Sequence, residues 1–275
     1  EELSLGQKTL RFIMAPMVHW PEVMVTYEVS QGILFAADAF GSFGAFSGNI
    51  FADEVDDIHI DEARRYYANI VGRYGPQVQA LLKKAQGLDL KMICSLHGYI
   101  WRGEMIPYIV DLYDKWSRYE PEKTGVVFVY ASMYGNTENA IQVLANKLAQ
   151  RGIRDMQMYD VSKTHASYII SELWKYSHAV FAAPTYNMHL YFNMDALLKD
   201  ISVLGLKNRK VALLGNFSWA GKAAASMKEY ITSLQNMELI SEPFDIRSAL
   251  KSEREQELDA LADAIYASVK ASMPQ

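Results

Sequence analysis

The chain has 275 residues, of which 50% are hydrophobic and 21% charged, and its net charge at pH 7 is -5. This composition is typical of a globular protein and excludes a disordered chain. The mildly acidic charge argues against a broad nucleic-acid-binding face, and no apolar run approaches the ~18 residues of a membrane span. The single cysteine, Cys94, excludes an internal disulfide and any module that holds a metal through several cysteines. It favours a reducing, cytoplasmic setting.

The first part of the chain contains short strands and two helices. Apolar periodicity predicts strands over 9–14, 24–28, 33–37 and 91–95, and helices over 60–74 and 77–86. So few strands do not close a sheet with two covered faces, and they indicate part of a larger domain. His59 lies beside the acidic run 53–57, and we expect this segment to be a solvated face.

A polar segment separates this part from the rest of the chain. Residues 119–124 carry Pro121 and lie between two regions of apolar periodicity. We therefore predict a first domain over 1–118, a linker over 119–124 and a second domain over 125–275.

In the second domain, strands and helices alternate. The run 125–131 is continuously apolar and rich in β-branched and aromatic residues, as expected of a strand buried on both faces. This alternation predicts an α/β fold with a doubly wound parallel sheet, in which ligands bind at the carboxyl ends of the strands. The pattern further predicts strands over 156–159, 178–183, 210–214 and 238–240, and helices over 138–150, 167–174, 193–204, 221–234 and 252–272.

The strongest motif follows the first strand of this sheet and opens its first helix. Hydroxyl donors, a glycine that allows close approach and a helix N-terminus suit a phosphate group. The neighbouring sequence has no lysine, which disfavours Mg-nucleotide hydrolysis. An ordinary capped strand–helix loop is the alternative. The motif consists of Ser132, Met133, Tyr134, Gly135, Asn136 and Thr137.

Two further loops follow other strands of the same sheet. Each combines an aromatic ring with small or amide side chains, which suits a flat ring bound beside aromatic residues. Taken singly, either aromatic residue is more simply a surface or core residue, but three such loops at one edge indicate a binding site. The loops consist of Pro184, Thr185, Tyr186 and Asn187, and of Asn216, Phe217, Ser218, Trp219 and Gly221.

These three loops resemble the FMN-binding loops of flavodoxin-like domains, and the segment 218–221 resembles the third loop of flavodiiron proteins (A-type flavoproteins). The segments 15–21, 34–44 and 95–102 of the first domain resemble that family's metal-ligand segments. The resemblance implies that 1–118 is the latter half of a metallo-β-lactamase-like (αββα) domain. It also implies that His19 and His97 each ligate one iron and that Asp38 bridges both.

Each of the three residues also has a simpler interpretation. His19 could lie in a turn, Asp38 could cap a helix or turn, and His97 could be a polar loop residue. The family's earlier His-x-Glu-x-Asp-His cluster, which supplies the other iron ligands, is absent from this sequence. Three ligands do not complete a di-iron site. We therefore expect a fragment whose missing half is cleaved, a separate chain or unseen, and whose open sheet face and unpaired edge make it either insoluble or dependent on a partner.

The resemblance implies an FMN- and non-haem di-iron-dependent oxidoreductase that reduces dioxygen to water, nitric oxide to nitrous oxide, or both. Electrons would pass from a separate donor, a rubredoxin-like protein or a reduced deazaflavin, through FMN to the di-iron site. The family also implies a head-to-tail homodimer. We expect no catalytic residue beyond the metal ligands, and no nucleic-acid or membrane partner.

Two alternatives remain open. A flavodoxin-like electron-transfer protein or fragment without a functional metal site is favoured by the absent ligand cluster. It is disfavoured by the presence of His19, Asp38 and His97 in family-like contexts. A zinc hydrolase on the lactamase-like scaffold is the weaker alternative, because it gives the fused flavin domain no purpose.

Overall fold

The computed structural model describes residues 1–46 and 48–273. It divides into two compact units, Glu1–Glu120 and Pro121–Gln275, and each is described by itself. The division falls within the segment predicted as a linker. Lys123 and Thr124, however, already belong to the first strand of the second unit, so that strand takes up the end of the predicted linker.

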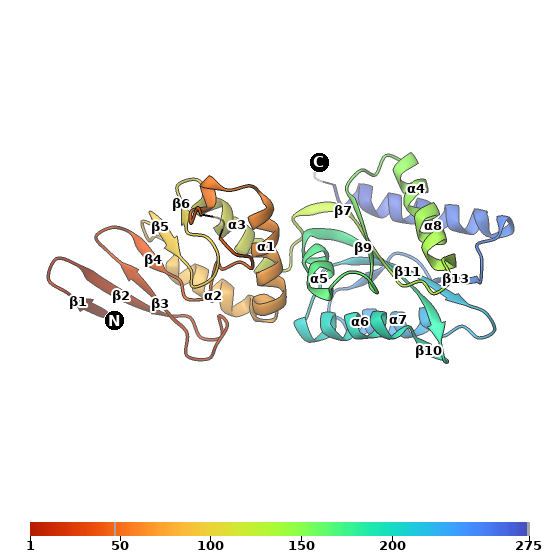
Figure 1. Ribbon diagram of the computed structural model, residues 1–275, viewed down its shortest axis with the longest axis horizontal. Coiled ribbons are helices and arrows are strands. Elements are labelled where there is room, and N and C mark those ends of the chain that lie inside the picture. Colours follow the sequence, from red (N-terminus) through yellow and green to blue (C-terminus); the bar gives the residue numbers. More distant parts are fainter. Residues whose placement is uncertain (47, 274–275) are drawn as a thin grey trace. The chain divides into compact units, whose positions relative to one another are not determined.

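The first unit is built on a six-stranded sheet with the order β1-β2-β3-β4-β5-β6 (Figure 1). Neighbouring strands are antiparallel except β4 and β5, which are parallel. The strands are β1 Glu2–Ser4, β2 Thr9–Met14, β3 Met24–Glu28, β4 Ile33–Phe35, β5 Met92–Cys94 and β6 Trp101–Arg102. The helices are α1 Ile58–Tyr66, α2 Gly75–Ala85 and α3 Met105–Ser117, with short helical turns at Ala52–Glu54, Tyr67–Val71 and Gly72–Tyr74.

The two faces of this sheet differ, as the alternation of side chains along a strand allows. One face is buried and contributes Val25, Tyr27, Leu34, Ile93 and Trp101 to the core. On the other face, Met14 and Met24 are direct cross-strand neighbours, and Phe35 lies nearby on β4. These three apolar side chains are between 42% and 51% exposed, so the expected open apolar face is present.

Four sequence expectations for this unit need correction. Strands β1 and β6 were not predicted, so the sheet has six strands where four were expected. The predicted helix over 60–74 is an α-helix that gives way to two short turns after Tyr66. Helix α3 was not predicted, although Ile109, Leu112 and Trp116 are buried at helical spacing. His59 is not on a solvated face: it is 3% exposed and lies between the rings of Tyr99 and Trp101. Apolar residues follow the acidic run, and they pack the start of helix α1, including His59, into the core.

The second unit is a doubly wound α/β domain with a parallel sheet in the order β12-β11-β9-β7-β8. Strand β13 also pairs with β11 in parallel, and β10 pairs with β9 in antiparallel. The strands are β7 Lys123–Tyr130, β8 Met156–Asp160, β9 Tyr176–Tyr186, β10 His189–Leu190, β11 Lys210–Phe217, β12 Glu238–Leu239 and β13 Phe244–Arg247. The helices are α4 Asn136–Gln150, α5 Ala166–Lys175, α6 Phe192–Leu204, α7 Ala223–Ser233 and α8 Glu255–Ala271, the last preceded by a turn at Ser252–Arg254.

Helices cover both faces of this sheet. Figure 1 shows α4 and α8 on one side of the strands and α5, α6 and α7 on the other. On the α4/α8 side, Val126 and Phe128 pack in a core with Leu144 and Ile265. Counted along the sequence, the five main strands have the order 2-1-3-4-5 of flavodoxin-like sheets, with β12 and β13 sharing the last position. The predicted α/β class is confirmed.

Four strands of this unit differ from the sequence prediction. Strands β9 and β11 run on to Tyr186 and Phe217, so the second and third predicted loops begin inside their strands and not after them. Strand β10 was not predicted. Strand β13 was not predicted, because Glu242-Pro243 before it and Asp245 within it interrupt the apolar pattern. Its pairing with β11 adds a neighbour to the edge where the predicted site lies.

Candidate functional site

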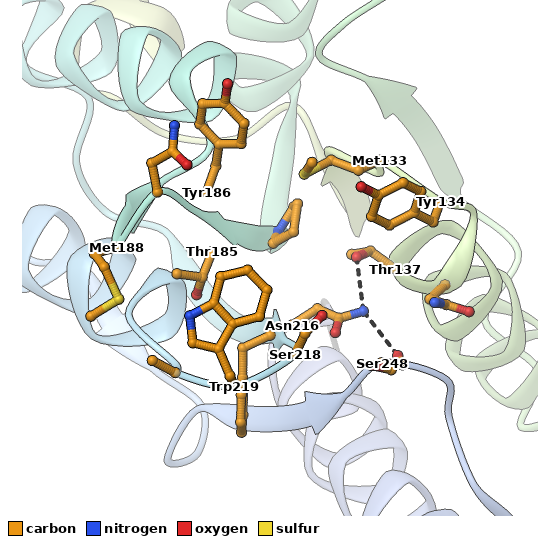
Figure 2. A pocket seen from close by; sticks show the side chains of 15 residues that line it. Met133, Tyr134, Thr137, Thr185, Tyr186, Met188, Asn216, Ser218, Trp219 and Ser248 are labelled. Carbon is orange, nitrogen blue, oxygen red and sulfur yellow. Dashed lines mark hydrogen bonds between the residues drawn. The ribbon is translucent and has the colours of Figure 1, made fainter.

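A cavity of about 300 Å³ lies at the carboxyl edge of the parallel sheet (Figure 2). This volume is at the lower end of the roughly 300–1,000 Å³ usual for small-molecule sites. The loops after β7 and β11, the end of β9 and one residue after β13 form its walls. Its fifteen described lining residues, none of them charged, are Met133, Tyr134, Asn136, Thr137, Pro184, Thr185, Tyr186, Asn187, Met188, Asn216, Phe217, Ser218, Trp219, Ala220 and Ser248.

The loop after β7 is shaped to hold an anion. Gly135 has a φ of 82° immediately before α4, a conformation that glycine adopts without strain. The hydroxyl of Ser132 accepts a hydrogen bond from the N–H of Glu138 at 3.3 Å. A helix begins with N–H groups that have no partner within the helix, so this end of α4 can bind a phosphate. Because no lining residue is charged, neutral donors would hold it.

Hydrogen bonds tie the three loops together. The side-chain amide of Asn216 donates to the hydroxyl of Thr137 at 3.2 Å and to the carbonyl of Ser248 at 3.1 Å, as Figure 2 shows. The hydroxyl of Thr185 accepts hydrogen bonds from the N–H groups of Lys222 at 2.9 Å and Ala223 at 3.1 Å. Thr185 thereby caps the start of α7. The cavity is preformed by these contacts.

Aromatic side chains with free surface surround the opening. Tyr134 and Trp219 are 84% and 82% exposed, and Tyr186 is 40% exposed. Figure 2 shows all three at the cavity, each on a different loop. Exposed rings of this size at a cavity suit a flat aromatic ligand that covers them. A flavin, with a phosphate at one end and a flat ring system at the other, fits this arrangement.

The structure brings together most residues predicted for this site. Twelve of the fifteen line the cavity; Ser132, Gly135 and Gly221 do not, although Ser132 and Gly135 shape the start of α4. Met188, Ala220 and Ser248 line the cavity and were not predicted. Met188 and Ala220 are direct neighbours of predicted residues. No sequence signal identifies Ser248, because it follows strand β13, which the sequence does not predict.

In the first unit, the three predicted metal ligands meet. The Nε2 atom of His19 lies 3.4 Å from Oδ2 of Asp38, and the Nε2 atom of His97 lies 3.3 Å from Oδ1. One carboxylate thus faces a histidine with each of its oxygens. The three side chains come from separate loops: His19 follows β2, Asp38 follows β4 and His97 follows β5. This is the arrangement in which a carboxylate can bridge two metals.

An aromatic side chain lies beside one of these ligands. Tyr66 is buried, and its ring centroid lies 5.8 Å from that of His97. Burial, and then the charge of Asp38, raise the pKa of the Tyr66 phenol, which keeps it protonated as a hydrogen-bond donor. Among the described residues, no three or more His, Cys, Asp or Glu side chains surround one point closely enough to hold an ion. The three ligands therefore fit part of a metal site.

The remaining histidines near the two sites, and Cys94, have other settings. His165 accepts a hydrogen bond from the N–H of Ser167 and caps α5. His189 is exposed and lines a cleft beside the cavity. Cys94 is half-buried, and desolvation raises the pKa of its thiol, so the reactive thiolate is disfavoured. No helix in the described part of the chain is both long and apolar enough to cross a membrane.

Comparison with known proteins gives matches to both units. The family model described as "ODP family beta lactamase" matches residues 1–98, and the model described as "Flavodoxin" matches residues 128–238. A rubredoxin-oxygen oxidoreductase of Megalodesulfovibrio gigas is 28% identical over 99% of this chain and 68% of its own length. A nitric oxide reductase of Moorella thermoacetica is 32% identical over 88% of this chain and 60% of its own length.

A solved structure covers both units at once. The flavodiiron protein of Giardia intestinalis matches with a TM-score of 0.91 and 26% identity over 100% of this chain and 68% of its own. The chain thus spans about two thirds of the length of these relatives. The chain is similar over its whole length to flavodiiron proteins, with a unit that matches the ODP family beta lactamase model followed by a unit that matches the flavodoxin model.

Proposed function

We propose that this chain is part of an FMN- and non-haem di-iron-dependent oxidoreductase that reduces dioxygen to water, nitric oxide to nitrous oxide, or both. The names of two relatives, a rubredoxin-oxygen oxidoreductase and a nitric oxide reductase, support these two substrates. When bound, FMN would accept electrons from a separate donor and the irons would bind the diatomic substrate.

The residues around the cavity have defined tasks in this proposal. The start of α4 and its preceding loop would hold the phosphate of FMN, since Thr137 is already oriented by Asn216. Trp219, Tyr186 and Tyr134 would cover the flavin ring and exclude water from part of it. Because the cavity lining carries no charge, the protein would hold the flavin through neutral hydrogen-bond donors and ring contacts.

The position of Asp38 carries the proposal. An electron-transfer flavodoxin needs no carboxylate between two histidines, yet Asp38 presents one oxygen to His19 and the other to His97. Its side chain is 13% exposed, so water competes weakly for those oxygens. Each histidine would ligate one iron and Asp38 would bridge both. The remaining ligands would come from outside the described residues.

The partners follow from the same proposal. The donor would be a separate rubredoxin-like protein or a reduced deazaflavin; the residues of this chain, with a single cysteine, do not themselves supply an iron–cysteine module. Two copies would form a head-to-tail dimer, in which the flavin of one copy would pass electrons to the irons of the other. The same low cysteine content supports a cytoplasmic setting.

The ratio of iron to FMN in the purified protein tests the proposal. Elemental analysis beside the flavin absorbance should give about two irons per FMN. Asp38→Asn should lower that ratio while the flavin content stays the same, because Asp38 lies in the other unit. Flavin without iron in the unmodified protein would instead favour the alternative, a flavodoxin-like electron-transfer protein.

Reduction of the substrate gives a second test. The photoreduced protein, prepared without oxygen, should consume added dioxygen or nitric oxide, and Asp38→Asn should do so more slowly. Equal rates in both proteins would assign the reaction to the flavin alone and contradict the role of the metal site.

A further inference from the structure

The loop that carries Asp38 is held by side chains that none of the sequence motifs includes. It runs from Ala37 to Ser42, between β4 and α1, and it has an unfavourable backbone. Ala37 and Phe40 have φ values of 51° and 63°, in the left-handed region that residues other than glycine rarely adopt. Such conformations persist only where the surrounding structure imposes them. The question is which contacts impose them here.

Both backbone hydrogen-bonding groups of Phe40 are bound by buried side chains. The N–H of Phe40 donates to the phenol oxygen of Tyr113 at 2.6 Å, and the indole N–H of Trp101 donates to the carbonyl of Phe40 at 2.8 Å. Tyr113 and Trp101 are 1% and 0% exposed. The rings of Phe40 and Tyr113 also stack, with centroids 4.4 Å apart. We call these three residues the Phe40 clamp.

Further contacts fix the two ends of the loop. The hydroxyl of Ser95 donates to the carbonyl of Ala39 at 2.7 Å. The N–H of Ser42 donates to the carbonyl of His97 at 3.2 Å, which joins the Asp38 loop to the His97 loop. A side chain on Gly98 would lie 2.0 Å from the hydroxyl oxygen of Ser42, so the two loops are in direct contact.

We infer that Tyr113 and Trp101 are positioning residues for Asp38, an inference that rests on the proposed metal-binding role of that carboxylate. They come from α3 and β6, two elements that carry no proposed ligand, and neither contacts Asp38 through a hydrogen bond. They bind the backbone of Phe40, two residues after Asp38, and this fixes the direction in which the carboxylate of Asp38 points. The clamp thereby keeps one oxygen of Asp38 toward each histidine.

Three variants of the full 275-residue chain test the inference. Tyr113→Phe removes the acceptor of the Phe40 N–H but keeps the stacked ring, and Trp101→Phe removes the indole donor. Tyr67→Phe is the matched control, because the hydroxyl of Tyr67 is buried without a hydrogen-bond partner among the residues that the structure describes, and its ring contacts the same Tyr113. The control removes a buried hydroxyl from the same cluster without releasing Phe40.

The first measurement is the ¹⁵N signature of the imidazole rings in histidine-labelled, metal-free protein. All variants are measured at one fixed pH, so that differences between their signals report changes in the contacts of the rings. Asp38→Asn defines the signals expected when the carboxylate is lost. Tyr113→Phe and Trp101→Phe should shift both His19 and His97 toward those positions, and Tyr67→Phe should shift neither. Unchanged rings in both clamp variants, or an equal shift in Tyr67→Phe, would overturn the inference.

Metal uptake is the second measurement, with Co²⁺ as the probe. The clamp variants should bind Co²⁺ roughly 10–100-fold more weakly than the unmodified chain, the usual loss when the support of a metal ligand is removed. If the unmodified chain binds no Co²⁺ but the rings respond as expected, the proposed function fails for this chain and the clamp stands. If Tyr113→Phe does not fold, Ser95→Ala, on a half-buried side chain, must give the same shift at His19.

Discussion

His178 joins the sheet of the second unit to its last helix. The side chain is 1% exposed. Its Nδ1 atom lies 2.7 Å from the hydroxyl of Ser177, and its Nε2 atom lies 3.0 Å from the hydroxyl of Ser268 on α8. Burial, and then the positive charge of Lys210, lower the pKa of His178 to about 4. The native state therefore holds this ring neutral, between two serines.

This setting predicts that acid destabilises the second unit. Unfolded histidine has a pKa near 6.5, so between about pH 6.5 and 4 the unfolded chain binds a proton that the native state does not. The free energy of unfolding should fall by about 2 kcal/mol over this range, and His178→Gln should remove most of that slope. Urea unfolding at several pH values measures it. The exposed His189→Gln is the control, and an unchanged slope in His178→Gln would contradict the prediction.

Asn216 supports a second prediction at the residue scale. Its amide links Thr137 to Ser248 across the cavity and is buried there. Asn216→Ala should weaken FMN binding by roughly tenfold, since two hydrogen bonds that order the loops contribute about 1 kcal/mol or more. Quenching of flavin fluorescence measures the dissociation constant. Asn236→Ala, which removes an exposed amide–amide bond to Asn208, should leave it unchanged.

At the scale of elements, β11 approaches both β13 and α7 closely at Gly215. A Cβ atom there would lie 2.1 Å from Oδ1 of Asp245 and 2.8 Å from Cβ of Ala224. Gly215→Ala should therefore lower the free energy of unfolding by about 1–3 kcal/mol, because the backbone of Ala224 cannot move away freely. Denaturant unfolding measures the loss. The double variant with Asp245→Ala should recover part of it; no recovery would show that the strain comes from α7 alone.

How far the sequence predicts these elements depends on how local their pattern is. The strands over 24–28 and 9–14 and the helix ending at Leu204 have their predicted ends, because apolar alternation or periodicity marks them directly. Strand β13 has four residues with a charge at Asp245, and only its pairing with β11 makes it a strand. The residues of the binding site show the same dependence. The sequence predicts the contiguous loops, but it does not predict Ser248, which only strand β13 brings to the site.

The metal site shows a different limit. Spacing along the chain does not show that His19, Asp38 and His97 converge, and each has a simpler interpretation by itself. Resemblance to a family named them, and the fold of the first unit places each histidine 3.3–3.4 Å from an oxygen of Asp38. The left-handed residues Ala37 and Phe40 have no signal in the sequence at all, because tertiary contacts impose them.

At the scale of the whole molecule, the two kinds of chemistry are separated along the chain. All described lining residues of the ring site fall within 133–248, inside the second unit, whereas the three proposed metal ligands fall within 19–97, inside the first. The second unit has its own sheet with helices on both faces and its own buried core. Such a unit can fold and bind its ligand without the other.

A chain of residues 121–275 should therefore bind FMN with nearly the affinity of the full chain. Its cavity walls, the start of α4 and the links through Asn216 and Thr185 are all retained. Flavin fluorescence titration of the two proteins under the same conditions measures the difference, and we expect a ratio within about threefold, less than 1 kcal/mol. A loss of tenfold or more would mean that the first unit, from the same or a second copy, covers part of the flavin. In that case the exposed rings of Tyr134 and Trp219 would be the surface to examine, because they have the most free area around the cavity.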